Sequence, residues 1–165
     1  MIGGATFSTD GRYRYRLWRR WDRSGPVVAF VMLNPSTADA FHDDPTIRRC
    51  IGFARSWGFG GIEVVNLFAL RATDPRKLQR ARDPVGRLND DAIRRATGRA
   101  RMVIAAWGLR GRDRAKRTRR LIGHEVYVLR LTQAGHPTHP LYLPKNLCPR
   151  QWPGMGVGKR SLPRV

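Results

Sequence analysis

Four short, mainly apolar runs constrain the fold of this chain more than any other feature of its sequence. They occupy residues 27–33, 62–68, 102–107 and 125–129. A strand has this composition when both faces of its sheet are covered, whereas a half-exposed strand alternates apolar and polar residues. Segments with helical periodicity separate the runs. The pattern therefore predicts a parallel sheet whose crossover helices cover both faces.

Three helices are expected between these runs. Asp44 followed by Pro45 is a favourable helix start, and the apolar stripe that follows ends at Gly58. A second helix begins at Asn89 or Asp90, and a third helix, rich in Arg and Lys, spans about residues 112–122. The expected fold is α/β: a three-layer α/β/α sandwich around a central, mainly parallel four-stranded sheet.

The two ends of the chain have a different character from this core. A turn signal at residues 9–11 separates two strand-like segments, which predicts an N-terminal β-hairpin within residues 1–25. Strict alternation in its second strand gives one basic face formed by Arg14, Arg16 and Arg20. Residues 144–165 lack periodicity and are interpreted as an irregular basic tail. We expect a single domain, 1–165, with the α/β core in residues 26–143.

The charge of the chain indicates a polyanionic partner. The chain has 32 Lys and Arg residues but only 12 Asp and Glu residues, which gives a formal charge of +20. Such an excess attracts phosphate backbones and releases their counterions, so DNA is the expected partner. No stretch approaches the ~18 consecutive apolar residues of a membrane span, and the N-terminus lacks a secretory signal. We expect a cytoplasmic monomer without a membrane partner.

Cofactor chemistry has no support in the sequence. Cys50 and Cys148 are too few for a four-thiolate metal or iron–sulfur site. No phosphate-binding loop, dinucleotide fingerprint or zinc-ligand spacing is present. We therefore expect neither a cofactor nor a metal.

Two asparagines stand where such a sheet binds ligands, beyond the carboxyl ends of its strands. Asn34 ends the first apolar run, and Pro35 fixes the turn after it. Its amide can hold a water, or it can merely close an Asx turn. Asn66 lies inside the second run, where its donor and acceptor suit either a base edge or neighbouring backbone.

Two histidines follow the fourth run. His136 and His139 each precede a proline, which stiffens the loop and fixes the imidazole. A metal site would need further ligands, for which His42, Asp43 and Asp44 are the candidates. A serine nucleophile is not indicated, because no Gly-x-Ser-x-Gly segment is present.

The order of these pieces resembles the uracil-DNA glycosylase superfamily. Residues 32–36 are similar to its first motif, a strand that ends in a Gly-x-Asp/Asn-Pro loop, with Met32-Leu33 in place of the expected glycine. Residues 65–73 are similar to the Thr-Asn-x-Val-x-x-Arg-x-Thr segment of the mismatch-specific branch. Residues 139–143 are similar to the His-Pro-x-x-Leu segment of the thermostable bacterial branch.

The whole chain also resembles a bacterial and phage family catalogued as a domain of unknown function. The segments that carry this second resemblance are 15–18, 32–39, 44–46, 106–108 and 139–143. It names a family without supplying a reaction, so the expected activity comes from the glycosylase resemblance.

That resemblance implies a monofunctional DNA glycosylase of the base-excision type, which flips uracil or a 5-modified uracil out of DNA and hydrolyses its N-glycosidic bond. Asn34 would position the attacking water, and His139 would donate a hydrogen bond to the departing base. Asn66 would read the base and Phe41 would stack on it. The reserve catalytic residues are Asp39, Asp44 and His136.

A further set of residues is expected to contact phosphates or to fill the gap left by the flipped base. It comprises Arg16, Ser36, Arg71, Arg110, Leu141, Tyr142 and Lys145, with Arg14, Arg20, Arg112, Arg114, Arg150, Lys159 and Arg160 as further basic contacts. The alternative function is a non-catalytic nucleic-acid-binding module on the same fold. A hydrolase of free nucleotides is disfavoured, because a small substrate needs only a local phosphate clamp rather than a charge of +20.

Overall fold

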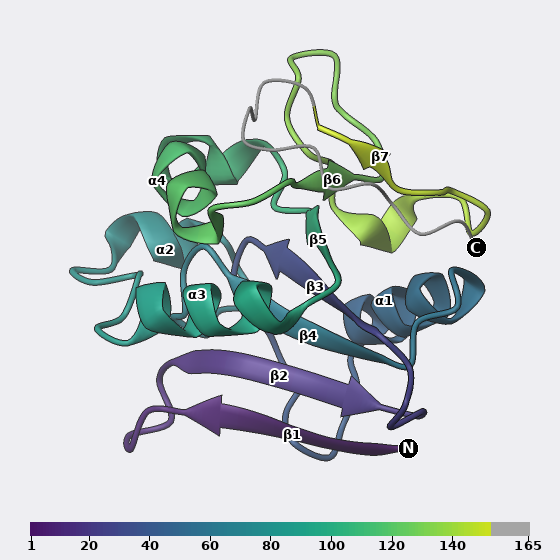
Figure 1. Cartoon of the computed structure of the whole chain (residues 1–165). Coiled ribbons are helices and arrows are strands. Elements are labelled where there is room, and N and C mark those ends of the chain that lie inside the picture. The colour runs from purple at the N-terminus through teal and green to yellow at the C-terminus, as the bar shows by residue number, and fades with distance from the viewer. Residues whose placement is uncertain (153–165) are drawn as a thin grey trace.

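The four apolar runs form the parallel strands at the centre of the sheet in a computed structural model, which describes residues 1–152 (Figure 1). These strands are β3 (Val27–Met32), β4 (Gly61–Asn66), β5 (Met102–Ala105) and β6 (Tyr127–Val128). The sheet has the order β1-β2-β4-β3-β5-β6-β7, and β4, β3, β5 and β6 are mutually parallel. The predicted α/β class with a mainly parallel core is confirmed.

The predicted N-terminal hairpin is also present, and it extends the central sheet. It consists of β1 (Ile2–Phe7) and β2 (Arg14–Arg20), and β2 pairs antiparallel with β4. Leu17 of β2 is fully buried in the core formed with β3, β4 and the first helix. The hairpin therefore contributes directly to the main hydrophobic core.

Residues 144–149 contain no helix or strand, as expected for an irregular tail, but a short strand that was not predicted follows them. Strand β7 (Arg150–Gln151) pairs antiparallel with β6, and the buried Trp152 packs edge-on against Trp107 with ring centroids 5.5 Å apart. The open edge of β6 and the apolar Trp152 ring hold this segment, although its composition lacks strand character. The predicted phosphate contacts Lys159 and Arg160 lie outside the described residues.

All three predicted helices form close to their expected positions. They are α1 (Pro45–Ser56), α3 (Asn89–Arg99) and α4 (Arg112–Ile122). At the start of α1, the Asp44 carboxylate accepts the Ile47 backbone N–H at 2.8 Å, as the cap signal predicts. Within residues 1–152, no helix has the length and hydropathy that a membrane-spanning helix requires.

Three short helical segments were not predicted. They are α2 (Arg76–Arg80) and two 3₁₀ turns, η1 (Leu109–Gly111) and η2 (Pro140–Tyr142). The pair Asp74-Pro75 before α2 repeats the Asp-Pro signal that precedes α1. Because one turn of helix has no room for an apolar stripe, periodicity could not reveal these segments.

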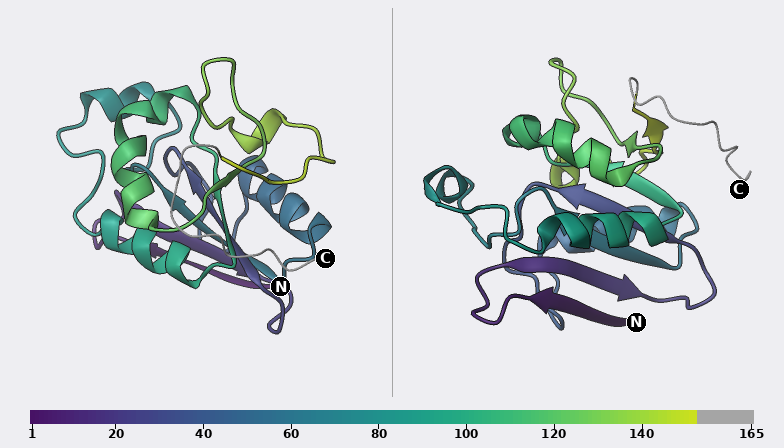
Figure 2. Two further views of the ribbon diagram at one scale, coloured as in Figure 1. Left: turned by 45° about the horizontal axis from the view of Figure 1, so that its top comes forward. Right: turned by 60° about the vertical axis from the view of Figure 1, so that its left-hand side comes forward.

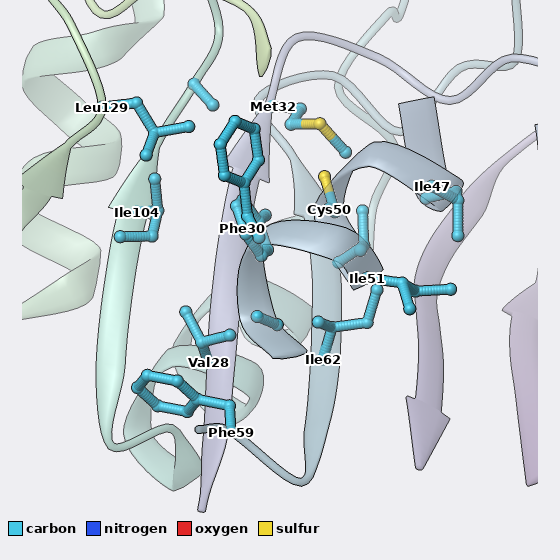
Figure 3. Packing of buried hydrophobic residues seen from close by; sticks show 14 of the residues in the cluster. Val28, Phe30, Met32, Ile47, Cys50, Ile51, Phe59, Ile62, Ile104 and Leu129 are labelled. Atoms are coloured by element: carbon cyan, nitrogen blue, oxygen red, sulfur yellow. The ribbon is translucent and has the colours of Figure 1, made fainter. Parts of the chain in front are cut away.

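Both faces of the central strands are buried, which explains their continuous apolar character. Val28, Phe30 and Ile62 pack against α1 on one face, where they meet its Cys50 and Ile51 (Figure 3). On the opposite face, the intervening strand residues pack in a second cluster with α3 and α4; this cluster includes Ala29, Val31, Val65, Ile93 and Ile122. Figures 1 and 2 show the resulting three layers.

Strand β2 departs from simple alternation near its start. Arg16 pairs with Thr6, but Arg14 pairs with Phe7, so the register shifts between these two positions. Such an irregularity places an extra residue in one strand and changes the direction of the side chains beyond it. Strict alternation therefore fails at Arg14.

As a consequence, the prediction that Arg14 shares an exposed basic face with Arg16 and Arg20 is wrong. Arg14 is only 2% exposed, and its Nη1 donates to the Ala38 carbonyl at 2.9 Å. The loop that Ala38 belongs to follows β3, so the register shift brings a guanidinium from the hairpin to the carboxyl end of the central sheet.

We expect Leu17→Ala to lower the free energy of unfolding by about 2–5 kcal/mol, because it leaves a cavity in a site that cannot fully collapse. Urea denaturation measures the change. Ile2→Ala, on the outer strand of the same hairpin and 47% exposed, is the control and should change stability by less than about 0.5 kcal/mol. Equally small losses in both variants would mean that the hairpin does not contribute to the core.

Candidate functional site

A pocket of about 170 Å³ lies beyond the carboxyl ends of β3 and β4. Three loops contribute its walls together with β2, β3 and α1, and the lining residues are Arg14, Met32, Leu33, Asn34, Ser36, Asp44, Thr46, Ile47, Ala72, Thr73, Pro75 and His139. An open α/β sheet binds ligands in this position. The structure thus brings together Asn34, Asp44 and His139, which come from three separate sequence motifs.

Packing between α1 and η2 explains how His139 reaches a pocket near β3. The turn η2 begins at Pro140 and packs against α1 (Figure 2). His139 immediately precedes that turn, and Asp44 immediately precedes α1. The contact therefore sets the start of each element at the wall of one pocket.

The side chain of Asn34 joins two loops of the pocket. Its Nδ2 donates to the carbonyl of Pro35 at 3.0 Å and to the carbonyl of Ala72 at 2.7 Å. Its Oδ1 has no hydrogen-bond partner among residues 1–152. The amide group therefore closes the turn with its nitrogen and leaves its oxygen available to a water or a ligand.

His139 is held as a neutral hydrogen-bond donor. Its Nδ1 accepts the Leu141 backbone N–H at 3.3 Å, so the neutral ring carries its proton on Nε2. Burial lowers the pKa of His139, and the negative charge of Asp44 opposes that effect only in part. At neutral pH, the imidazole presents an N–H rather than a full positive charge.

Asp44 has two functions at this position. One carboxylate oxygen, Oδ1, caps α1 through the Ile47 N–H, and the residue also lines the pocket. In the described part of the chain, its Oδ2 makes no hydrogen bond or ion pair. That oxygen can accept a proton from a water in the pocket.

Arg14 lines the pocket, although the sequence analysis placed it on a basic face of the hairpin. Its Nη2 lies 3.4 Å from Asn66 Oδ1, and its buried Nε has no partner among the described residues. Burial lowers the pKa of Arg14 to about 10. No local signal could have found it, because its position depends on the shifted register of β2.

Four predicted site residues are not brought into the pocket lining. Asn66 is 1% exposed and lies in contact with Arg14, and Phe41 is 89% exposed. The Asp39 carboxylate accepts the backbone N–H groups of Phe41 and His42, which lowers the pKa of Asp39 to about 2. His136 also lies outside the lining.

The alternative metal site is not assembled either. Residues 1–152 contain no group of three or more His, Cys, Asp or Glu side chains placed to hold a metal ion. Asp43 instead pairs with Arg19 at 2.8 Å, and His42 Nδ1 lies 3.2 Å from Asp39.

Several of the predicted DNA contacts surround the pocket. Ser36 lines it, and the exposed Arg71 directly precedes Ala72 of the lining. Leu141 and the 89% exposed Tyr142 belong to η2, the turn that directly follows His139. The unpredicted helix α2 adds exposed basic residues next to Pro75 of the lining, namely Arg76, Lys77 and Arg80. Two of these residues already have partners, since Arg71 donates to the Gly11 carbonyl at 3.2 Å and Arg76 pairs with Asp74 at 2.9 Å.

Other predicted contacts are more distant from the pocket or are already paired. Arg16 forms a two-point ion pair with Glu63, and Arg114 pairs with Asp90. Arg20 donates to the Gly25 carbonyl at 3.1 Å. Four further side chains are exposed outside the lining, namely Arg110, Arg112, Lys145 and Arg150.

Comparison with known proteins places the chain in a family. The sequence model of one family, described as "Protein of unknown function (DUF1643)", matches residues 14–141. Searches of the curated proteins and of the solved structures found no match. These comparisons do not test the resemblance to the uracil-DNA glycosylase superfamily, which stays a prediction. Because the match includes most of the chain, from β2 through the His139 turn, this protein belongs to the DUF1643 family.

Proposed function

We propose that this protein is a monofunctional DNA glycosylase that removes uracil or a 5-modified uracil flipped out of DNA. The observation that carries the proposal is the convergence of Asn34, Asp44 and His139 on one pocket. At about 170 Å³, the pocket is smaller than the ~300–1,000 Å³ sites of drug-sized ligands. That size suits a single flat base rather than a larger cofactor.

His139 supports departure of the base in this reaction. When the bond between C1′ of the sugar and the base nitrogen breaks, its electron pair stays on the base, and negative charge develops on the ring oxygens. A hydrogen bond from Nε2–H of His139 to the 2-oxo group stabilises that charge. A neutral ring already held by the Leu141 N–H needs no rearrangement to donate it.

Asn34 and Asp44 support attack by water. Oδ1 of Asn34 accepts one hydrogen bond from the water and orients it, but an amide cannot remove a proton. The Asp44 carboxylate accepts that proton as the water oxygen bonds to C1′, and the proton finally reaches the departing base. The products are an abasic sugar and the free neutral base, so water supplies both the hydroxyl group and the hydrogen.

DNA as the partner is supported by the charge of +20 and by the exposed basic residues beside the pocket, including Arg71 and those of α2. Phosphate contacts of this kind position a strand without reading its sequence. Binding should therefore weaken steeply as salt concentration rises.

Alkaline strand cleavage of labelled oligonucleotides tests the reaction. The wild type should form abasic sites at uracil or a 5-modified uracil, with thymine mismatches, hypoxanthine and modified cytosines as comparison substrates. Asn34→Ala and His139→Ala should each lower the rate about 10²–10³-fold, because each removes a preorganised group that acts in the transition state. DNA affinity should change little, since phosphate contacts dominate it.

His136→Ala is the matched control, because His136 also precedes a proline but lies outside the pocket lining. It should retain wild-type activity. Tight, salt-sensitive DNA binding without an abasic product on any of these bases would contradict the glycosylase proposal and favour a non-catalytic binding module.

The pH dependence of the cleavage rate gives a second prediction. The lowered pKa keeps His139 neutral below the ~6.5 of an ordinary histidine. The single-turnover rate should therefore stay constant as the pH is lowered past 6.5 and should fall only at lower pH. There, protonation of His139 Nδ1 breaks its hydrogen bond with the Leu141 N–H. Rates measured between pH 5 and 8 check this. A rate that rises as pH falls below 6.5 would contradict the assigned role of neutral His139.

A further inference from the structure

Arg14 is a cation buried inside the protein. It is 2% exposed, and no carboxylate of residues 1–152 forms a salt bridge with it. Arg19, on the same strand and 3% exposed, provides a direct comparison, because it pairs with Asp43 at 2.8 Å. Charged side chains are rarely buried unless they are paired, since removing a charge from water is costly. The ion pair with Asp43 compensates for the burial of Arg19. No comparable pair within residues 1–152 compensates for the burial of Arg14, so its burial needs another explanation.

The hydrogen bonds of Arg14 leave much of its capacity unused. A guanidinium has five N–H donors. One Nη1–H donates to the Ala38 carbonyl at 2.9 Å, and Nη2 makes a long contact of 3.4 Å with Asn66 Oδ1. The buried Nε of Arg14 and the buried Nδ2 of Asn66 have no partner within the described residues.

The surrounding charges do not neutralise Arg14. The Asp44 carboxylate stabilises the charge of Arg14 from beyond ion-pair distance, whereas the cations Arg71 and Arg19 oppose it. With a pKa of about 10, the guanidinium still carries its charge at neutral pH. Because Arg14 also lines the pocket, its positive charge lies at one wall, where poor solvent screening strengthens its interaction with a nearby anion.

We propose that Arg14 stabilises an anion inside the pocket and that this anion is the departing pyrimidine. The inference rests on the proposed function and adds a residue and a substrate class to it. Arg14 offers donors only, so it favours 2,4-dioxopyrimidines, whose two carbonyl oxygens share the negative charge. In a base such as cytosine, an exocyclic amino group replaces one of these oxygens. That group is itself a hydrogen-bond donor, so it cannot accept a hydrogen bond from Arg14.

The rate on uracil compared with 5-fluorouracil in the same oligonucleotide tests the inference. Fluorine withdraws electron density and makes the base a better leaving group. Arg14→Met should lower the rate on uracil by about 100-fold or more. Its loss on 5-fluorouracil should be smaller, because that base depends less on help from the protein. Arg14→Lys keeps the charge and should retain most of the rate.

Stability separates this role from a structural one. Arg14→Met should leave the melting temperature unchanged or raise it, because it removes a buried charge without a counterion. Arg19→Met is the matched control, since Arg19 donates to the Asp39 carbonyl in the same loop but does not line the pocket. It should lower the melting temperature by leaving Asp43 unpaired, and it should keep the wild-type ratio between the two substrates.

The outcomes distinguish failure of the inference from failure of the proposed function. Equal losses on both bases, or no loss, in Arg14→Met would overturn the inference and leave the glycosylase activity standing. If the wild type forms no abasic site, the proposed function fails. Isothermal titration calorimetry then measures the affinity of the wild type and of Arg14→Met for free uracil and free 5-fluorouracil. Tighter binding of the more acidic 5-fluorouracil, abolished in Arg14→Met, would still support an anion site. If the wild type binds 5-fluorouracil no more tightly than uracil, the assignment of an anion site to Arg14 is overturned as well.

Discussion

Burial of the central strand β3 on both faces is the constraint on which the rest of the structure depends. Val28 and Phe30 pack toward α1, while Ala29 and Val31 pack toward α3 and α4. The edges of β3 are also filled, because it pairs with β4 on one side and β5 on the other. Polar side chains are therefore excluded along β3, and the first polar side chain after the strand is that of Asn34. The pocket lies at that end for this reason.

The pocket combines groups whose surroundings give them different electrostatic states. His139 is kept neutral by burial and by a backbone N–H, whereas Asp44 is a carboxylate that uses one oxygen to cap α1. The positive end of the α1 dipole adds to the preference for anions near Asp44. Arg14 supplies a full charge that no carboxylate of residues 1–152 pairs with. A neutral donor, a carboxylate and a cation around about 170 Å³ suit a reaction in which a neutral base leaves as an anion.

The hairpin gives this site a component that the α/β core alone lacks. Its strand β2 joins the sheet through β4, and the irregular register at its start directs Arg14 to the loop after β3. The family match begins at Arg14 itself and extends to Leu141, two residues beyond His139. The matched segment therefore contains every residue that lines the pocket. The exposed basic residues of α2 and Arg71 lie next to the same lining and add positive charge around it.

Local patterns determined the α/β class, the four core strands and the three longer helices, and they marked Asn34 and the two His-Pro histidines. The resemblance to the glycosylase superfamily singled out His139 and added Asp44 as a catalytic candidate. Apolar periodicity, a cap-plus-proline pair and polar residues at strand ends are properties of neighbouring residues, so a single sequence displays them. Only the tertiary structure placed Arg14 in the pocket, left Phe41 and Asp39 outside it and paired β7 with β6. A register shift of one residue reverses the direction of a side chain, and contacts between distant segments leave no periodic trace in the chain.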